Sequence, residues 1–232
     1  MDQLEVWGKL ARPEEVGVVP RHVSPSMLVP KPDDAENFRL VTDFTSLNIW
    51  IKKLETTLPT IAEAKLVMAQ FTYMIEFDLT SWYFQSGMPL SSIQYLGTVH
   101  PRGGLRVYTC EPQGIKNAAE HGKEKLARIY QDMIRRKELT IMADNGFIGA
   151  STLPELTENY REVLNRVTLA GLTFKPSKIV ICAASSMIFG WKRTCEGAWS
   201  PTEHTTSPLI YADPPKTVKQ MRSYLGATLG MH

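Results

Sequence analysis

The sequence predicts an α+β fold in which helices cover one face of a small antiparallel sheet. The segment TYMIEFDL is rich in aromatic and branched residues and predicts a strand that ends at Asp78. The segment IMADNGFIGA predicts a hairpin, because Asn145 and Gly146 suit a tight turn between two apolar arms. With the amphipathic patterns between and after them, the order is strand, helix, hairpin, helix, strand, as in split βαβ folds.

The elements before this unit are less regular. The first thirty or so residues contain five prolines and are expected to be extended. The segment FRLVTDFTSLN alternates apolar and polar residues, which is typical of an edge strand. Thr60 is expected to cap a helix over IAEAKLVMAQF.

Two amphipathic helices and two short strands follow. In the first helix, apolar residues recur at helical spacing with charges opposite them. The second begins with Pro154 and Glu155 and is followed by Gly171, which suits a helix C-cap. The expected ranges are 116–137 and 154–170 for the helices and 178–182 and 187–191 for the strands.

Composition places the chain among soluble globular proteins. Its 232 residues, 43% hydrophobic and 22% charged, are enough for a substantial core. No apolar run approaches a membrane span and no signal-peptide pattern opens the chain, so no membrane partner is expected. Three cysteines without CxxC spacing indicate reduced intracellular thiols. A net charge of +2 neither requires nor excludes a nucleic-acid partner.

Two aspartates are the main candidates for chemistry. The predicted topology brings Asp78, at the end of one strand, close to Asp144 on the hairpin. Two such carboxylates repel each other unless a divalent cation lies between them, and Mg²⁺ suits carboxylates combined with substrate phosphates. Spacing alone leaves open the alternative that Asp78 caps a turn and Asp144 occupies a hairpin tip. The sequence contains no P-loop, HExxH or GxSxG pattern.

Several segments, taken in order, resemble motifs of reverse transcriptases from gypsy-type LTR retrotransposons and retroviruses. The similarity extends over residues 24–227, and an ordered series is more specific than any single motif. The segments are RLVTDF with Leu47 and Asn48, FDL with Ser81, Tyr83 and Gln85, PQGIKNA, MADN, Gly171-Leu172 with PSK, IFGW, PPKTV and MRSYLG. The chain is thus similar to the reverse transcriptase domain of a gypsy-like pol polyprotein, with Met-Ala-Asp-Asn at the catalytic hairpin.

The resemblance implies a right-hand polymerase fold, with a palm of antiparallel sheet plus two helices, fingers and an incomplete thumb. It also divides the chain into five parts. These are residues 1–70 for the N-terminal extension and fingers, 71–89 for the first palm strand, 90–108 for the fingers return, 109–190 for the palm, and 191–232 for the primer grip and partial thumb.

The implied activity is template-directed nucleotidyl transfer, that is, RNA- or DNA-directed DNA synthesis by a two-metal mechanism. The implied cofactor is Mg²⁺, with Mn²⁺ as an alternative. The implied partners are an RNA or DNA template with its primer and deoxynucleoside triphosphates. The expected location is the cytoplasm, virus-like particles included, or the nucleus, and the sequence does not give the oligomeric state.

The resemblance also assigns roles to individual residues. Asp78 and Asp144 would ligate the metal ions with the carbonyl of Leu79, and Asn145 completes the catalytic hairpin. Tyr83 would be a steric gate under the incoming sugar or an ordinary core aromatic, and Gln113 and Gly114 would approach the nucleotide. Arg39, and less strongly Lys31, would contact the triphosphate. Lys178 would protonate pyrophosphate or remain a solvated lysine. Phe189, Gly190 and Trp191 would buttress the primer strand or fill the palm core.

Three departures leave a second function open. Asn145 stands where the family has another aspartate, Met142 replaces the hairpin tyrosine, and the sequence ends at His232, which indicates a fragment or truncated copy. An amide binds Mg²⁺ less well than a carboxylate does. The alternative function is therefore a catalytically degenerate reverse-transcriptase-like domain that acts as a nucleic-acid-binding or interaction module. A third possibility is an α+β domain whose motif matches are accidental.

Overall fold

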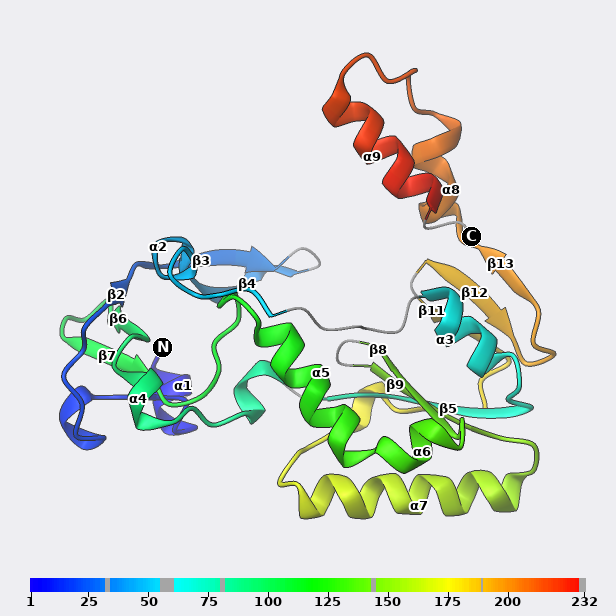
Figure 1. Ribbon diagram of the computed structural model, residues 1–232, viewed down its shortest axis with the longest axis horizontal. Helices are drawn as coiled ribbons and strands as arrows, with labels where there is room; N and C mark the ends of the chain where they lie inside the picture. Colours follow the sequence, from blue (N-terminus) through cyan, green and yellow to red (C-terminus); the bar gives the residue numbers. More distant parts are fainter. Residues whose placement is uncertain (32–33, 55–60, 80–81, 143–144, 189, 230–232) are drawn as a thin grey trace. The chain divides into compact units, whose positions relative to one another are not determined.

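The computed structural model describes residues 1–31, 34–54, 61–79, 82–142, 145–188 and 190–229 (Figure 1). The chain forms two compact units, and each draws on three stretches of the sequence. The first unit comprises Met1–Thr56, Leu79–Leu126 and Gly171–Thr173, and the second comprises Thr57–Asp78, Ala127–Ala170 and Phe174–His232.

The first unit contains a four-stranded sheet and a two-stranded ribbon, β3–β4. The sheet has the order β1-β7-β6-β2, with β2 parallel to β6 and the other neighbours antiparallel. Its buried core holds Leu10, Phe44, Leu47, Leu96 and Tyr108. The elements are α1 (Asp2–Val6), β1 (Leu10–Ala11), the 3₁₀ helix η1 (Pro13–Glu15), β2 (Val23–Ser24), β3 (Ser26–Lys31), β4 (Asp34–Thr42), α2 (Thr45–Asn48), the 3₁₀ helix η2 (Trp82–Gln85), α4 (Leu90–Ile93), β6 (Gly97–Val99), β7 (Leu105–Tyr108) and most of α5 (Ala118–Ile129).

The second unit is built on the antiparallel sheet β10-β5-β9-β8. A three-stranded sheet, β11-β12-β13, and two C-terminal helices follow it. The elements are α3 (Ile61–Met68), β5 (Tyr73–Asp78), α6 (Gln131–Arg135), β8 (Leu139–Met142), β9 (Asn145–Ala150), α7 (Leu153–Leu169), the 3₁₀ helix η3 (Pro176–Lys178), β10 (Val180–Ile181), β11 (Ser185–Ile188), β12 (Trp191–Thr194), β13 (Trp199–Pro201), α8 (Glu203–Ile210) and α9 (Val218–Leu229).

The predicted strand and hairpin are confirmed as β5 and the β8–β9 pair, and FRLVTDF contributes most of β4. The turn was wrongly placed, because Asn145 and Gly146 are the first residues of β9 and pair with Met142 and Ile141 of β8. Helices α6 and α7 lie along one face of the β5 sheet, as expected (Figure 1). The opposite face packs on α3, where Met68 meets Met74 and Phe147 in a buried cluster. The cap expected at Thr60 lies outside the described residues.

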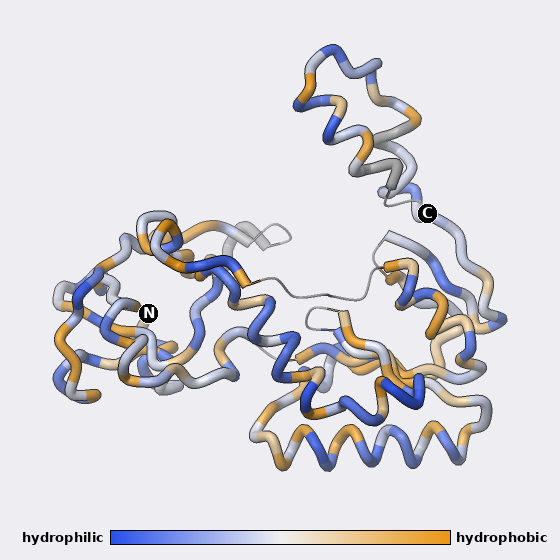
Figure 2. The backbone as a smooth tube through the Cα atoms, in the orientation of Figure 1, coloured by the Kyte–Doolittle hydropathy of each residue, from blue (hydrophilic) through white to orange (hydrophobic). Residues whose placement is uncertain are grey.

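Helix α7 shows why the sequence forms this layer. Thr152 caps it, since its hydroxyl accepts a hydrogen bond from the Glu155 amide while the Glu155 carboxylate accepts one from the Thr152 amide. Gly171 follows the helix with φ +65°, as its predicted C-cap role requires. Hydrophobic and hydrophilic residues alternate along α7, and its apolar side is buried (Figure 2).

The single helix predicted over 116–137 is interrupted, because α5 ends at Ile129 and α6 starts at Gln131. Arg166 explains the break. Its guanidinium donates a hydrogen bond of 2.8 Å to the Ile129 carbonyl and so satisfies a group that the interrupted helix leaves open. Tyr130, at the break, is fully buried and donates a hydrogen bond to the Val163 carbonyl.

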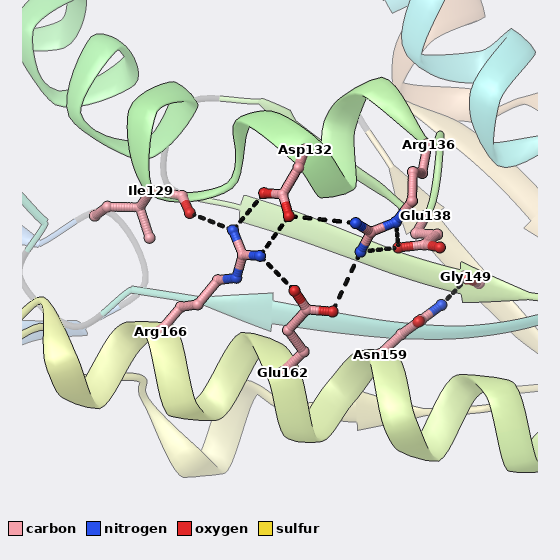
Figure 3. Close-up of polar contacts among 8 residues, drawn as sticks. All are labelled: Ile129, Asp132, Arg136, Glu138, Gly149, Asn159, Glu162 and Arg166. Carbon is pink, nitrogen blue, oxygen red and sulfur yellow. Dashed lines mark hydrogen bonds and ion pairs between the residues drawn. The ribbon is translucent and has the colours of Figure 1, made fainter.

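The same arginine organises a network of charges between α6 and α7 (Figure 3). Arg166 binds both carboxylate oxygens of Asp132, at 2.5 and 2.6 Å, and also pairs with Glu162. Arg136 connects Asp132, Glu138 and Glu162. Hydrogen bonding to Arg166 holds the pKa of Asp132 well below its usual range. The network therefore ties the two helices to each other and to the start of β8.

Three local expectations need correction. The chain is not irregular throughout its first thirty residues: α1 and β1 form there, and β1 is held by pairing with β7, which no local pattern reveals. The strand expected at 178–182 is shortened to β10 by the preceding η3. The strand expected at 187–191 is not continuous: Met187 and Ile188 end β11, Trp191 begins β12, and Gly190 before it adopts φ +80°.

None of the helices in the described part of the chain is long and apolar enough to cross a membrane.

Candidate functional site

Asp78 lies at the end of β5, where several elements of the second unit meet. Its carboxylate is 2.7 Å from the ammonium of Lys178, and its backbone carbonyl accepts a hydrogen bond from the Lys175 amide. Pairing of β10 with β5 brings the η3 turn that carries Lys178 to this place. The Asp78 side chain is 12% exposed and that of Lys178 is 52% exposed.

The register of β5 and β9 places Asn145 directly opposite Asp78. Two aromatic contacts fix this end of the strand pair. The Phe77 ring covers Gly146, where an added Cβ would lie 2.0 Å from the ring, and it packs on Phe174 with 4.6 Å between centroids. The side chains of Asp78 and Asn145 therefore share one face of the sheet at a defined register.

A second carboxylate occupies the same strand face. Glu76 lies two residues before Asp78, and alternation along a strand puts both on one side. Burial, and then the negative charge of Asp78, raise the pKa of Glu76. The strand face that carries Glu76 and Asp78 thus disfavours further negative charge, and the Lys178 ammonium offsets part of the charge already there.

The candidate metal ligands are only partly within the described residues. Asp144 lies outside them, so its predicted pairing with Asp78 stays a prediction. Within the described chain, no three His, Cys, Asp or Glu side chains gather into a metal-binding group. The donors near Asp78 are oxygens, a carboxylate and the Asn145 amide with the Leu79 carbonyl next along the chain, and oxygen donors fit a hard cation such as Mg²⁺.

The first unit holds the segment Gln113–Gly114, whose two residues are exposed. Gly114 has φ +96°, a conformation that favours glycine. Asn48 fixes this segment: its amide donates to the Gly114 carbonyl at 3.0 Å, and its side-chain oxygen accepts from the Lys116 amide at 2.8 Å. The Lys116 ammonium also donates hydrogen bonds to the backbone carbonyls of Asn48 and Ile51.

A second asparagine fastens the same two segments. Asn117, with φ +71°, accepts a hydrogen bond from the Leu54 amide and donates one to the Lys52 carbonyl. The side chains of Asn48, Lys116 and Asn117 thus lock the loop after α2 to the PQGIKNA segment. Sequence reasoning placed all three in the family motifs but gave them no role.

Tyr83 lies half-buried on η2 in the first unit. Its neighbour Trp82 packs over Gly122 of α5, so closely that a Cβ at Gly122 would lie 2.3 Å from the indole ring. Gln85 makes two hydrogen bonds, of 2.9 and 2.7 Å, to the backbone of Thr173. Packing and hydrogen bonding on either side therefore hold the short helix that carries Tyr83.

The remaining predicted residues are distributed over both units. Arg39 is exposed on β4, opposite Val29, and Lys31 ends β3, although its side chain lies outside the description. Phe189 also lies outside the described residues. In the second unit, the Gly190 carbonyl accepts hydrogen bonds from the Thr202 amide and the Thr205 hydroxyl.

Trp191 is buried, 7% exposed, beneath the side chain of Lys65 from α3. The Lys65 ammonium lies 3.4 Å from the centroid of the Trp191 ring and 5.7 Å from that of Trp199. The sequence alone gave no signal for Lys65, because its partners come from strands more than a hundred residues away.

The structure thus brings the predicted residues together in two sets. Asp78, Asn145 and Lys178 meet in the second unit, where Gly190 and Trp191 also lie. Arg39, Tyr83, Gln113 and Gly114 belong to the first unit.

Comparison with known proteins gives retrotransposon polyproteins among the sequence relatives. No protein-family model matches the chain. The Transposon Tf2-7 polyprotein of Schizosaccharomyces pombe is 24% identical over 203 residues, which are 88% of this chain, and the Transposon Tf2-3 polyprotein is 23% identical over the same length. The chain spans 15% of the length of these polyproteins.

Solved structures with a similar fold include a foamy viral enzyme. The foamy viral protease-reverse transcriptase in complex with dsDNA superposes with a TM-score of 0.77 over 98% of this chain and 45% of that one, at 18% identity. The same enzyme in complex with an RNA/DNA hybrid gives 0.74 over 97% of this chain and 29% of that one, also at 18% identity. The mixed α/β fold is therefore that of a reverse transcriptase, and the sequence relatives support a reverse-transcriptase-like domain.

Proposed function

We propose that this chain is the polymerase core of a gypsy-like retroelement and transfers deoxynucleotides to a primer 3′ end on an RNA or DNA template. The observation that carries the proposal is the position of Asp78, a buried carboxylate at the end of β5 opposite the MADN hairpin residue Asn145. The second unit would supply most of the palm with the primer grip and partial thumb, and the first unit would supply the fingers together with palm residues 79–89, 109–126 and 171–173.

In this function Asp78, Asp144 and the Leu79 carbonyl would hold Mg²⁺. When bound, the ions activate the primer hydroxyl and stabilise the leaving pyrophosphate. Lys178, already beside Asp78, would release that carboxylate and donate a proton to pyrophosphate. Arg39 would bind triphosphate oxygens as a charged fork, and Tyr83 would exclude a 2′-hydroxyl.

Primer extension on poly(rA)/oligo(dT) with Mg²⁺ or Mn²⁺ tests the proposal. Asp78→Ala is expected to lower the rate by about a thousandfold, because metal stabilisation supplies several kcal/mol. Glu158→Ala, which removes an exposed carboxylate of α7, is the matched control and should extend primers normally. Unchanged extension by Asp78→Ala would exclude the mechanism.

A degenerate binding module is the second candidate function. It is favoured by Asn145, which brings no charge to the site, and by the Lys178 ammonium already paired with Asp78. The original chain would then bind primer–template without extending it. Extension that appears only in Asn145→Asp would identify residue 145 as the lesion in an otherwise competent fold.

The Asn145→Asp variant also has a readout that does not depend on activity. A carboxylate directly opposite Asp78 adds like-charge repulsion across the strands, so the variant should melt at a lower temperature without metal. Mn²⁺ should restore more of its stability than it adds to the original chain. Equal stabilisation of both chains by Mn²⁺ would argue against a metal site at this position.

A further inference from the structure

We propose that Lys65 is a binding residue for a nucleic-acid phosphate, held in place by Trp191 and Trp199. The inference rests on the proposed function and adds a contact that the motif resemblance does not include. It depends on an ammonium that lies against two tryptophans and that pairs with no carboxylate in the part of the chain that the structure describes.

The geometry shows how Lys65 is held. Lys65 projects from α3 onto β12 and β13, with its ammonium 3.4 Å from the Trp191 centroid and 5.7 Å from that of Trp199. An indole face attracts a cation, and more strongly where water is partly excluded. The two rings therefore fix the side chain in one direction, so binding an anion costs little further side-chain entropy.

The electrostatics indicate what Lys65 lacks. Burial alone lowers its pKa, and no carboxylate counteracts that effect. Among the described residues, none accepts a hydrogen bond from its ammonium or forms an ion pair with it, although an ammonium has three N–H donors. The rings attract the ammonium but offer no strong hydrogen-bond acceptor, so an anionic oxygen would accept hydrogen bonds from its N–H groups.

The position of Lys65 favours a phosphodiester as that anion. Its ring partner Trp191 follows Gly190 in the IFGW segment, which by the family resemblance would lie against the primer strand. Trp191 itself is too buried to stack on a base. The lysine above it is the group of this pair that can reach a ligand, and a phosphate of the primer backbone fits its charge.

The salt dependence of binding tests this inference. Binding of a DNA duplex with a recessed 3′ end is measured across a series of salt concentrations for the original chain, Lys65→Met and Lys65→Arg. Loss of one phosphate contact lowers the slope of log K against log salt by about 0.9. Lys65→Met should show this decrease and bind up to about fivefold more weakly at low salt. Lys65→Arg keeps the charge and the ring contact, so its slope should be unchanged.

Lys192→Met is the matched control, because Lys192 is exposed on β12 and points away from the Trp191 side. It should keep the original slope. A slope in Lys65→Met equal to that of the original chain, or an equal decrease in Lys192→Met, would overturn the inference. If Lys65→Met fails to fold, Lys65→Gln replaces it and is judged by the same slope.

The failures of the two proposals are distinguishable. If the original chain binds no duplex, the proposed function fails and the inference fails with it. If the original chain binds duplex and Lys65→Met has lower thermal stability with an unchanged slope, only the inference fails, and the Lys65 contact is structural.

Discussion

Two aspartates of the second unit each meet a basic side chain from a distant part of the sequence, and the two ion pairs are built differently. Asp132 receives two hydrogen bonds from Arg166, and Arg136 and Glu162 extend the contact into a network. Asp78 receives a single contact from Lys178. A planar guanidinium fixes a carboxylate at two points, whereas an ammonium on a flexible stem fixes it at one.

The difference indicates which charge is structural and which can change partners. The Asp132 side chain is 48% exposed, yet its arginine also bonds the Ile129 carbonyl at the break between α5 and α6. Asp78 is largely buried, and the lysine on it is half-exposed. A buried carboxylate whose one ion-pair partner among the described residues is a half-exposed lysine is what the proposed metal site requires.

The comparison is tested most strongly by Arg166→Met. This change leaves the Ile129 carbonyl without its side-chain donor and removes one of the two arginines that bind Asp132 and Glu162, so the free energy of unfolding should fall by about 1–3 kcal/mol. Thermal melting should detect a decrease of about 2–4 °C for each kcal/mol in a chain of this size. Arg161→Met is the control, because Arg161 lies on the same helix and its one ion pair with a described residue is to exposed Glu158. Equal decreases in unfolding free energy in Arg166→Met and Arg161→Met would show that the Arg166 network is no more structural than an exposed ion pair.

Lys178→Met tests the exchangeable pair. If the ammonium competes with a metal ion for Asp78, its removal should tighten Mn²⁺ binding roughly fivefold, which corresponds to about 1 kcal/mol. Isothermal titration of the original chain and of the variant measures this. Weaker Mn²⁺ binding in Lys178→Met would show that the lysine supports the site rather than competing for it.

The pH dependence of stability tests the Asp132 pair, and here the expected effect is the smallest and most gradual. The lowered pKa of Asp132 means that its pairing stabilises the fold above the unfolded carboxyl pKa of about 3.9, and this stabilisation is lost as pH falls below that value. The original chain should therefore have a higher melting temperature than Asp132→Asn at pH 7. The difference between the two melting temperatures should become smaller as the pH falls from 5 to 3. A gap independent of pH would mean that Asp132 acts through packing rather than charge.

Sequence patterns predicted the elements whose signals are local. The strand ending at Asp78 and the cap at Gly171 follow from alternation and backbone freedom, and both are present. The hairpin is also present, but Asn145 and Gly146, predicted as its turn, are paired residues of β9. The break after Ile129 was missed because Arg166, which satisfies the exposed carbonyl, lies 37 residues away. Local periodicity contains no information about such a partner.

The candidate site divides in the same way. The motifs located Asp78 and Lys178, but only the pairing of β10 with β5 shows that the two side chains meet. Asn48 and Lys116 belong to the sequence motifs, but the hydrogen bonds between their segments are seen only in the structure. Lys65 carried no motif at all, since its environment is formed by rings from β12 and β13.

The contact of Trp82 with Gly122 has a consequence for the evolution of this chain. Because the indole occupies the space that any side chain at position 122 would need, residue 122 cannot become larger while Trp82 is present. A larger residue at 122 is accessible only after, or together with, a smaller one at 82. An alignment of relatives should therefore show the two positions varying inversely in volume, forty positions apart, with Trp82 restricted to lineages that carry glycine at 122.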